Sequence, residues 1–161
     1  MKRIAGGLLV FINGENADKV CYALSTLYWW NSNYKVIMAD SDVVADYSIN
    51  NFANNLGQRL INGSILFLSN ANNPETLDRI NKSGILIDDE GWTVTININP
   101  KEETDDKGVL NDTLSHIIHG NVIENCTDII DNILQHSTII EDDEENYYFT
   151  RITKSGERNY Y

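Results

Sequence analysis

The alternation of short apolar runs with segments of helical spacing is the feature that most constrains how this chain folds. Residues 8–12 form a continuous apolar run that ends at Asn13-Gly14, as expected for a strand buried on both faces. Two further runs of this kind alternate with two segments of helical spacing: 17–28, 34–39, 49–60 and 65–68. Strands that alternate with helices pair in parallel through right-handed crossovers. The sequence therefore predicts an α/β fold, a three-layer and mostly parallel sheet of about 4–6 strands with flanking helices.

The pattern continues to residue 87 and then changes. A helix start at Asn73-Pro74-Glu75 and an apolar run at 85–87 complete a predicted βαβαβαβ core over residues 1–87. From Trp92 to Ile98, apolar residues alternate with threonine and asparagine. A period of two is typical of a half-exposed strand, and we expect this strand to be antiparallel and to pair with 85–87.

Residues 88–161 are expected to complete the same single domain, which spans 1–161, because 161 residues is the size of one domain. They are predicted to hold that antiparallel strand, two helices and a C-terminal hairpin. The helices are placed at 110–118 and 122–134, and the hairpin joins 138–140 to 147–152 through an acidic turn. The tail from Arg158 is predicted to be loose.

Acidic residues are concentrated in one segment. The net charge is −12, and residues 101–145 hold two lysines against thirteen acidic residues. Such a surface repels nucleic acid and anionic membranes and attracts basic protein surfaces. Our first hypothesis is a small, acidic, intracellular protein-binding regulator or inhibitor without catalysis, of the immunity-protein or phage anti-defence type, which binds a basic partner. A solvated acidic face without a partner is the alternative interpretation.

The residues expected to bind that partner are acids of the segment and two consecutive tryptophans. A helix cannot bury both tryptophans on one face, so at least one is predicted to be exposed, and exposed tryptophans often anchor interfaces. A tryptophan that covers the end of the sheet is the alternative. The set comprises Trp29, Trp30, Glu102, Glu103, Asp105, Asp106, Glu141, Asp142, Asp143, Glu144 and Glu145.

The two cysteines indicate a reducing compartment. Cys21 and Cys126 both fall on apolar faces of predicted helices, which does not fit a disulfide framework. The N-terminal apolar run lacks the length and the cleavage site of a signal peptide. We therefore expect a cytoplasmic protein that needs no disulfide or metal to fold.

Polar residues end several of the predicted strands, and ligands bind at the carboxyl ends of parallel strands. Asp40 and Asp42 follow one strand, Ser69 follows another, and Asp88 and Asp89 follow a third. These residues resemble the motifs of the haloacid dehalogenase-like phosphatases. The resemblance implies that Asp40 is the nucleophile, Asp42 the general acid and Ser69 a phosphate ligand, and that the acidic pair holds Mg²⁺.

The resemblance supports an alternative hypothesis, a Mg²⁺-dependent phosphoryl-transfer enzyme in which Asp40, Asp42, Asp88 and Asp89 supply the metal ligands. The chain departs from that family because the first motif lies on the second predicted strand and only nineteen positions separate Ser69 from Asp88. Turn and cap chemistry, with Ser41 or Asp42 as an N-cap, is the competing interpretation of these residues.

Two further readings use other polar residues. A nucleotide or signal-molecule binder without turnover would use Glu15, Asp40 and the asparagines at 70, 72 and 73. A zinc site would use His116, His119, Cys126 and His136, although histidines near helix carboxyl ends fit the sequence as well. The phosphate-loop and Gly-x-Gly-x-x-Gly patterns are absent. Apart from Mg²⁺ in the enzyme hypothesis, no cofactor is predicted.

Overall fold

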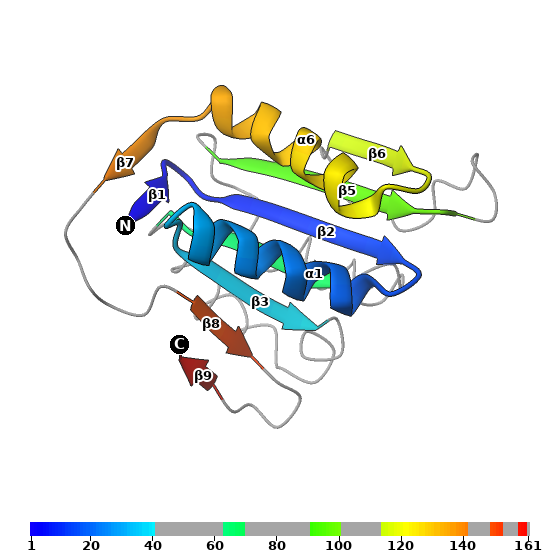
Figure 1. Cartoon of the computed structure of the whole chain (residues 1–161). Helices are drawn as coiled ribbons and strands as arrows, with labels where there is room; N and C mark the ends of the chain where they lie inside the picture. The colour runs from blue at the N-terminus through cyan, green and yellow to red at the C-terminus, as the bar shows by residue number, and fades with distance from the viewer. Residues whose placement is uncertain (41–62, 70–90, 101–113, 142–148, 153–157, 161) are drawn as a thin grey trace, which may run out of the picture.

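The computed structural model describes residues 1–40, 63–69, 91–100, 114–141, 149–152 and 158–160 (Figure 1). Strands account for the largest share of the described residues, and two helices and a short π-helix, η1, account for much of the rest. In chain order the elements are β1 (Lys2–Ile4), β2 (Leu8–Gly14), α1 (Ala17–Thr26), η1 (Leu27–Asn31), β3 (Val36–Asp40), β4 (Ile65–Ser69), β5 (Trp92–Ile98), β6 (Leu114–Ile118), α6 (Val122–Gln135), β7 (Ile139–Glu141), β8 (Phe149–Ile152) and β9 (Arg158–Tyr160).

The main sheet is 7-stranded, with the order β6-β5-β2-β4-β3-β8-β9. All of its neighbouring strands pair in parallel except β8 and β9. A separate 2-stranded sheet pairs β1 with β7. The predicted α/β class, with a mostly parallel sheet and flanking helices, is confirmed.

The core lies on both faces of β2. Leu8, Val10 and Ile12 pack into one cluster with the apolar stripes of α1 and α6, which lie on the same face of the sheet (Figure 1). Successive side chains of a strand point to opposite faces. Leu9 and Phe11 on the second face are also buried, so both faces of the central strand are covered. The uninterrupted apolar run follows from this double burial.

The two helices follow from their apolar spacing. In α1, Ala17, Val20, Cys21 and Leu24 form the buried stripe, and in α6 the stripe is Cys126, Ile130, Ile133 and Leu134. Both cysteines are buried free thiols, as the sequence predicts. Neither helix is long and apolar enough to cross a membrane, and the same holds for every helix of the described ranges.

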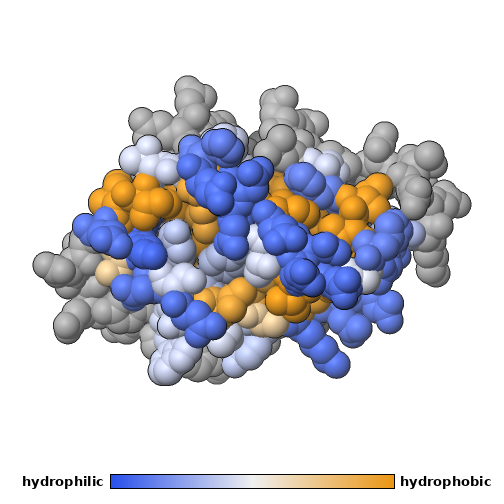
Figure 2. All heavy atoms as spheres, turned by 45° about the horizontal axis from the view of Figure 1, so that its top comes forward, coloured by the Kyte–Doolittle hydropathy of each residue, from blue (hydrophilic) through white to orange (hydrophobic). Residues whose placement is uncertain are grey.

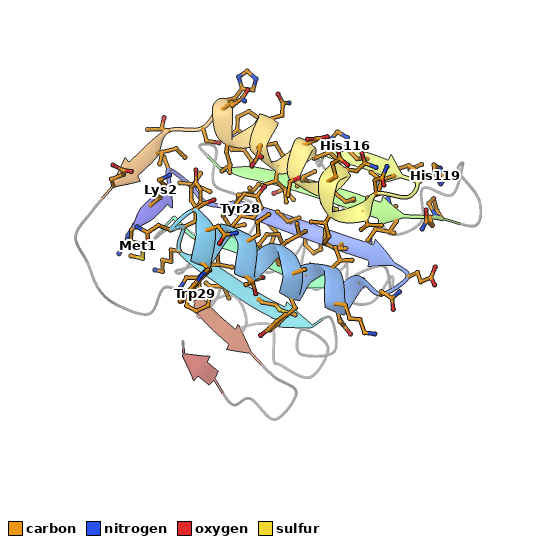
Figure 3. The ribbon with its side chains drawn as sticks, in the orientation of Figure 1. Met1, Lys2, Tyr28, Trp29, His116 and His119 are labelled. Atoms are coloured by element: carbon orange, nitrogen blue, oxygen red, sulfur yellow. The ribbon has the colours of Figure 1, made fainter. Side chains whose placement is uncertain are left out.

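A polar contact connects η1, which follows α1 directly, to α6. The Tyr28 hydroxyl in η1 donates a hydrogen bond of 2.8 Å to Asp131 Oδ1 on α6 (Figure 3). Burial raises the pKa of the Tyr28 hydroxyl, and the bond to Asp131 raises it further. The Tyr34 ring packs edge-on against Tyr28, at 6.2 Å between centroids. The end of α1 is therefore held to α6 by a buried aromatic cluster and a charged acceptor.

The consecutive tryptophans lie in η1 and differ in exposure. Trp30 is 73% exposed, whereas Trp29 packs partly against the core. Their rings meet edge to face, with 5.5 Å between centroids. The prediction that at least one of them is exposed is confirmed.

The structure corrects the element predicted at 110–118. Residues 114–118 form the strand β6, parallel to β5, and not a helix. Ser115 and Ile117 are exposed while Ile118 is buried, an alternation with the period of a strand. His116 and His119 consequently do not share a helix face.

The strand at 92–98 is also corrected. It is the strand β5, which pairs in parallel with both β2 and β6, and not a half-exposed antiparallel strand. Its alternating threonine misled the prediction, because Thr95 is fully buried beside Phe11. The predicted partner at 85–87 lies outside the described residues.

The predicted C-terminal hairpin is wrong. β7 pairs antiparallel with β1 and places Glu141 opposite Lys2, a favourable cross-strand charge pair. β8 instead extends the main sheet in parallel beside β3 and pairs antiparallel with β9. Residues 158–160, expected to be loose, form β9.

The Tyr28–Asp131 contact generates a stability prediction. In a double-mutant cycle of Tyr28→Phe and Asp131→Ala, we expect each change to destabilise the fold by about 1–2 kcal/mol, because each removes a partly buried hydrogen bond to a charged group. The coupling between them should be about 1 kcal/mol, measured by urea unfolding. Strictly additive effects would contradict the contact.

A second prediction concerns alkaline pH. Burial raises the pKa of the Cys126 thiol to about 11, and that of Tyr28 is also raised. As pH rises from about 8.5, the unfolded chain loses protons that the folded chain retains, so the free energy of unfolding should fall. Unfolding curves between pH 8 and 10.5 check this. The variant Tyr28→Phe/Cys126→Ala should show a shallower fall, and equal slopes would contradict the assignment.

Candidate functional site at the carboxyl ends of the parallel strands

The carboxyl ends of the parallel strands meet at one edge of the sheet (Figure 1). From the central strand β2 the chain passes to β3 on one side, and from β5 it passes to β6 on the other side. Connections that leave neighbouring strands in opposite directions create a crevice where ligands of open α/β sheets bind. The ends of β2 and β5 therefore mark the expected site.

The turn from β2 into α1 is tightly constrained. Gly14 has a φ of +119°, and a Cβ built there would lie 2.4 Å from the carbonyl oxygen of Ile98. No side chain fits between the two strand ends. Asn16 follows in the left-handed region, with φ 57°, and is the N-cap of α1. A glycine at 14 thus lets the ends of β2 and β5 approach closely.

The amino end of α1 opens at this edge. The first helical hydrogen bond runs from Val20 N to Asn16 O at 3.0 Å, and the Asn16 side chain makes no cap hydrogen bond. The N–H groups of the first turn therefore have no intrahelical acceptor. Together with the helix dipole, they create a positive potential that favours an anion.

On the α1 side of the edge, two strand ends gather polar groups around the first helical turn. The Ser69 hydroxyl, fully buried at the end of β4, donates a hydrogen bond to the exposed carboxylate of Asp18. Ser69 is in register with Ile12 of β2 and with Asp40 of β3. The edge thus brings together a hydroxyl, a carboxylate and a second aspartate position.

On the other face of the sheet, an asparagine pair spans the ends of β2 and β5. Asn13 and Asn97 are in register, and Asn13 Nδ2 donates to Asn97 Oδ1 at 3.4 Å. Asn13 is only 3% exposed, and its Oδ1 has no hydrogen-bond partner among the described residues. A buried polar atom without a partner is costly.

A third group of contacts fixes the turn from β6 into α6. Asn99 Oδ1 accepts a hydrogen bond from Gly120 N at 3.3 Å, and Asn125 Nδ2 donates to Gly120 O at 2.8 Å. Asn99 N also donates to Ile118 O at 2.9 Å. The amino end of α6 is thereby held beside the end of β5.

The structure shows where some of the predicted site residues lie. Asp40 and Ser69 are brought to adjacent register positions, and Glu15 lies exposed in the turn before α1. Trp29 lies at the opposite end of the molecule from His119 (Figure 3), and Glu141 is exposed on β7. The remaining predicted residues lie outside the described ranges: Asp42, Asn70, Asn72, Asn73, Asp88, Asp89, Glu102, Glu103, Asp105, Asp106, Asp142, Asp143, Glu144 and Glu145.

The zinc hypothesis finds no support. Among the described residues, no group of three or more histidine, cysteine or acidic side chains could hold a metal ion. Cys126 is fully buried in the core, and burial raises the pKa of its thiol to about 11, which disfavours the thiolate that binds zinc.

Sequence reasoning missed Asp18, Asn13 and Asn97. Asp18 stands in the first turn of the helix that follows the first long strand, a position where an acid is usually explained by the helix dipole. Asn97 was assigned to the solvent side of a half-exposed strand. The sequence held one indication of this pair, because Asn13 and Asn97 each stand near the carboxyl end of an apolar strand.

The face that carries β6, α6 and β7 shows apolar patches separated by hydrophilic residues (Figure 2). The described residues include exposed large apolar side chains at Ile123 on α6 and Ile140 on β7, and at Ile117 on β6. They come from three different elements, and scattered exposed apolar residues of this kind are normal on a protein surface.

No family model matches the sequence, and no curated protein sequence matches it. Among solved structures, the chain resembles that of a cysteine-to-alanine mutant of the Mycobacterium tuberculosis APS kinase CysC. The likeness covers 81% of this chain and 99% of the other, with a TM-score of 0.47 and 14% identity. A likeness at this level assigns no residue role to this chain.

The comparisons do not bear out our first functional hypothesis. The solved structure that the chain resembles is that of a kinase, not of an inhibitor, an immunity protein or a phage anti-defence protein. The expectation of a non-catalytic acidic inhibitor finds no support. Acidic composition led to it, and much of the acidic segment, 101–113 and 142–145, lies outside the described residues.

Proposed function

We propose that this chain is a Mg²⁺-dependent phosphoryl-transfer enzyme that binds the phosphate groups of a nucleotide at the carboxyl edge of its parallel sheet. The observation that carries the proposal is the contact of Ser69 with Asp18 on the first turn of α1, beside the register position of Asp40. This edge combines a helix amino end, which attracts phosphate, with the Asp18 carboxylate and a second aspartate position, and carboxylates attract a divalent cation.

The amino end of α1 offsets part of the electrostatic repulsion that the net negative charge would exert on a phosphate group. A phosphate ligand is repelled by a chain of net charge −12 unless local groups compensate. The uncapped N–H groups of α1 supply such compensation at short range, and Lys19 stands in the same first turn. Phosphate binding is therefore compatible with this edge in spite of the overall charge.

The donor set fits Mg²⁺. This ion commonly takes one or two carboxylates, keeps several waters and completes its shell with substrate phosphates. Asp18 and Asp40 would supply the carboxylates, and the Ser69 hydroxyl would orient Asp18. Mg²⁺ bound there would neutralise charge that develops on a transferring phosphoryl group.

The residues of this chain have separate roles in the proposal. Ser69 holds one carboxylate oxygen of Asp18, which leaves the other oxygen for the cation. Gly14 lets the ends of β2 and β5 lie in close contact, which fixes where the turn enters α1. The helix N–H groups orient the phosphate. A cytoplasmic location would supply both nucleotide and Mg²⁺.

Calorimetric titration with ATP, GTP, CTP and UTP, with and without Mg²⁺, tests the proposal. We expect Mg²⁺-dependent binding of at least one nucleotide, and Asp18→Asn should weaken it about tenfold or more, because one charged metal ligand is lost. Asp128→Asn on the exposed face of α6 is the matched control. Phosphorus NMR of the same mixtures follows turnover.

Three outcomes are informative. Failure of every nucleotide to bind would refute the proposal, as would equal affinities of the Asp18 and Asp128 variants. Binding without any turnover, including in mixtures with candidate acceptors, would leave a nucleotide binder and remove the catalytic part.

A further inference from the structure

β6 forms one edge of the main sheet, and none of the described strands lies on its outer side. In an extended strand, the N–H and C=O of one residue point to the same side, and those of the next residue point to the other side. Ile118 O accepts a hydrogen bond from Asn99 N at 2.9 Å, so the backbone groups of Ile118 and His116 face β5. The backbone groups of Ser115 and Ile117 therefore face outward.

This edge lacks the usual protection against further pairing. Proteins commonly protect an edge strand with charged side chains, proline or a bulge. The opposite edge strand, β9, has 3 residues and carries Arg158. β6 has 5 residues, Leu-Ser-His-Ile-Ile, and it pairs with β5 in unbroken register. Ser115 and Ile117 are also exposed on the face away from α6, so neither face of the sheet hides the edge at these residues.

Charge indicates what kind of strand this edge accepts. Two copies of a chain with a net charge of −12 repel each other, so they meet most favourably where carboxylates are absent. Residues 113–123, which contain β6, hold no aspartate, glutamate, lysine or arginine, although they lie inside the acidic segment 101–145. A charged partner finds no opposite charge on this stretch, whereas a second copy presents an equally neutral edge.

The flank of α6 on the same side of the molecule is neutral as well. α6 packs against β5 and α1, and β6 lies beyond β5 on the side away from α1 (Figure 1). The acids Glu124, Asp128 and Asp131 recur at intervals of three or four residues and so share one stripe of the helix. The bond from Tyr28 to Asp131 places this stripe toward α1. The stripe on the other flank consists of neutral residues, Asn125, Ile129 and Asn132.

We propose that two copies of this chain pair through β6, antiparallel across a two-fold axis at His116, so that their main sheets join into one. Ser115 of each copy exchanges both of its backbone hydrogen bonds with Ile117 of the other copy. The neutral flanks of the two α6 helices then face each other on one side of the joined sheet. The inference does not rest on the proposed function, because pairing uses the side of β6 and not the carboxyl ends of the strands.

Sedimentation equilibrium of the full chain from about 1 μM to about 1 mM tests the proposal. With rising concentration, the mass of the wild type should change from 18.3 kDa to twice that value. Ile117→Lys places like charges close to the two-fold axis and should remain a monomer throughout this range. Ile140→Lys adds the same charge at an exposed isoleucine of β7, and this matched control should dimerise as the wild type does.

A second variant and a second measurement separate loss of the dimer from loss of the fold. Ser115→Pro removes an N–H donor that faces outward, and edge strands accept proline at such a position. This variant should be monomeric and should keep the circular dichroism spectrum of the wild type. In the wild type, the amides of Ser115 and Ile117 should exchange hydrogen about tenfold or more slowly at high concentration than at low concentration, measured by NMR.

A wild type that stays monomeric at every concentration would overturn the proposal, as would exchange rates at Ser115 and Ile117 that do not change with concentration. A dimer that persists in Ile117→Lys or in folded Ser115→Pro would show that the contact lies elsewhere. If Ile140→Lys is also monomeric, added charge and not the edge controls association, and the role of β6 is wrong. A dimer that binds no nucleotide would refute the proposed function alone.

Discussion

The parallel pairing of β2 with two neighbours is the constraint on which the rest of the structure depends. Leu8 is in register with Ile65 of β4 on one side and with Trp92 of β5 on the other. These registers bring the ends of three strands to one edge and leave both faces of β2 to be covered. The strand is buried on both faces, through Leu9 and Phe11 on one and Val10 and Ile12 on the other. The turn at Gly14 therefore follows directly from a strand that is held on every side.

The elements that sequence predicted correctly are those whose burial is uniform. Continuous apolar runs at 8–12 and 65–68 are strands, and the regular stripe of α6 is a helix. Prediction failed where burial and polarity disagree. Thr95 is buried although it is polar, and Ile117 is exposed although it is apolar, so β5 and β6 carried misleading local patterns. Strand pairing also failed for β7 and β8, because their partners β1 and β3 are distant in the sequence.

The same limit governs how much of the candidate site was predictable. The rule that ligands bind at strand carboxyl ends correctly selected Asp40 and Ser69 for one edge. It did not select Asp18, because its contact with Ser69 crosses from a helix to a strand about fifty positions away in the chain. Asn13 and Asn97 are farther apart still, and only their register shows that they form a pair.

The close approach of Gly14 to Ile98 has a consequence for how this protein can vary. A methyl group at position 14 would lie 2.4 Å from a backbone oxygen, which no rotamer change can relieve. Any mutation there must push the ends of β2 and β5 apart. Glu15, one residue later and exposed, has no such restriction. Laboratory evolution toward a different ligand would therefore substitute position 15 readily. Position 14 would accept only changes that also displace the ends of β2 and β5.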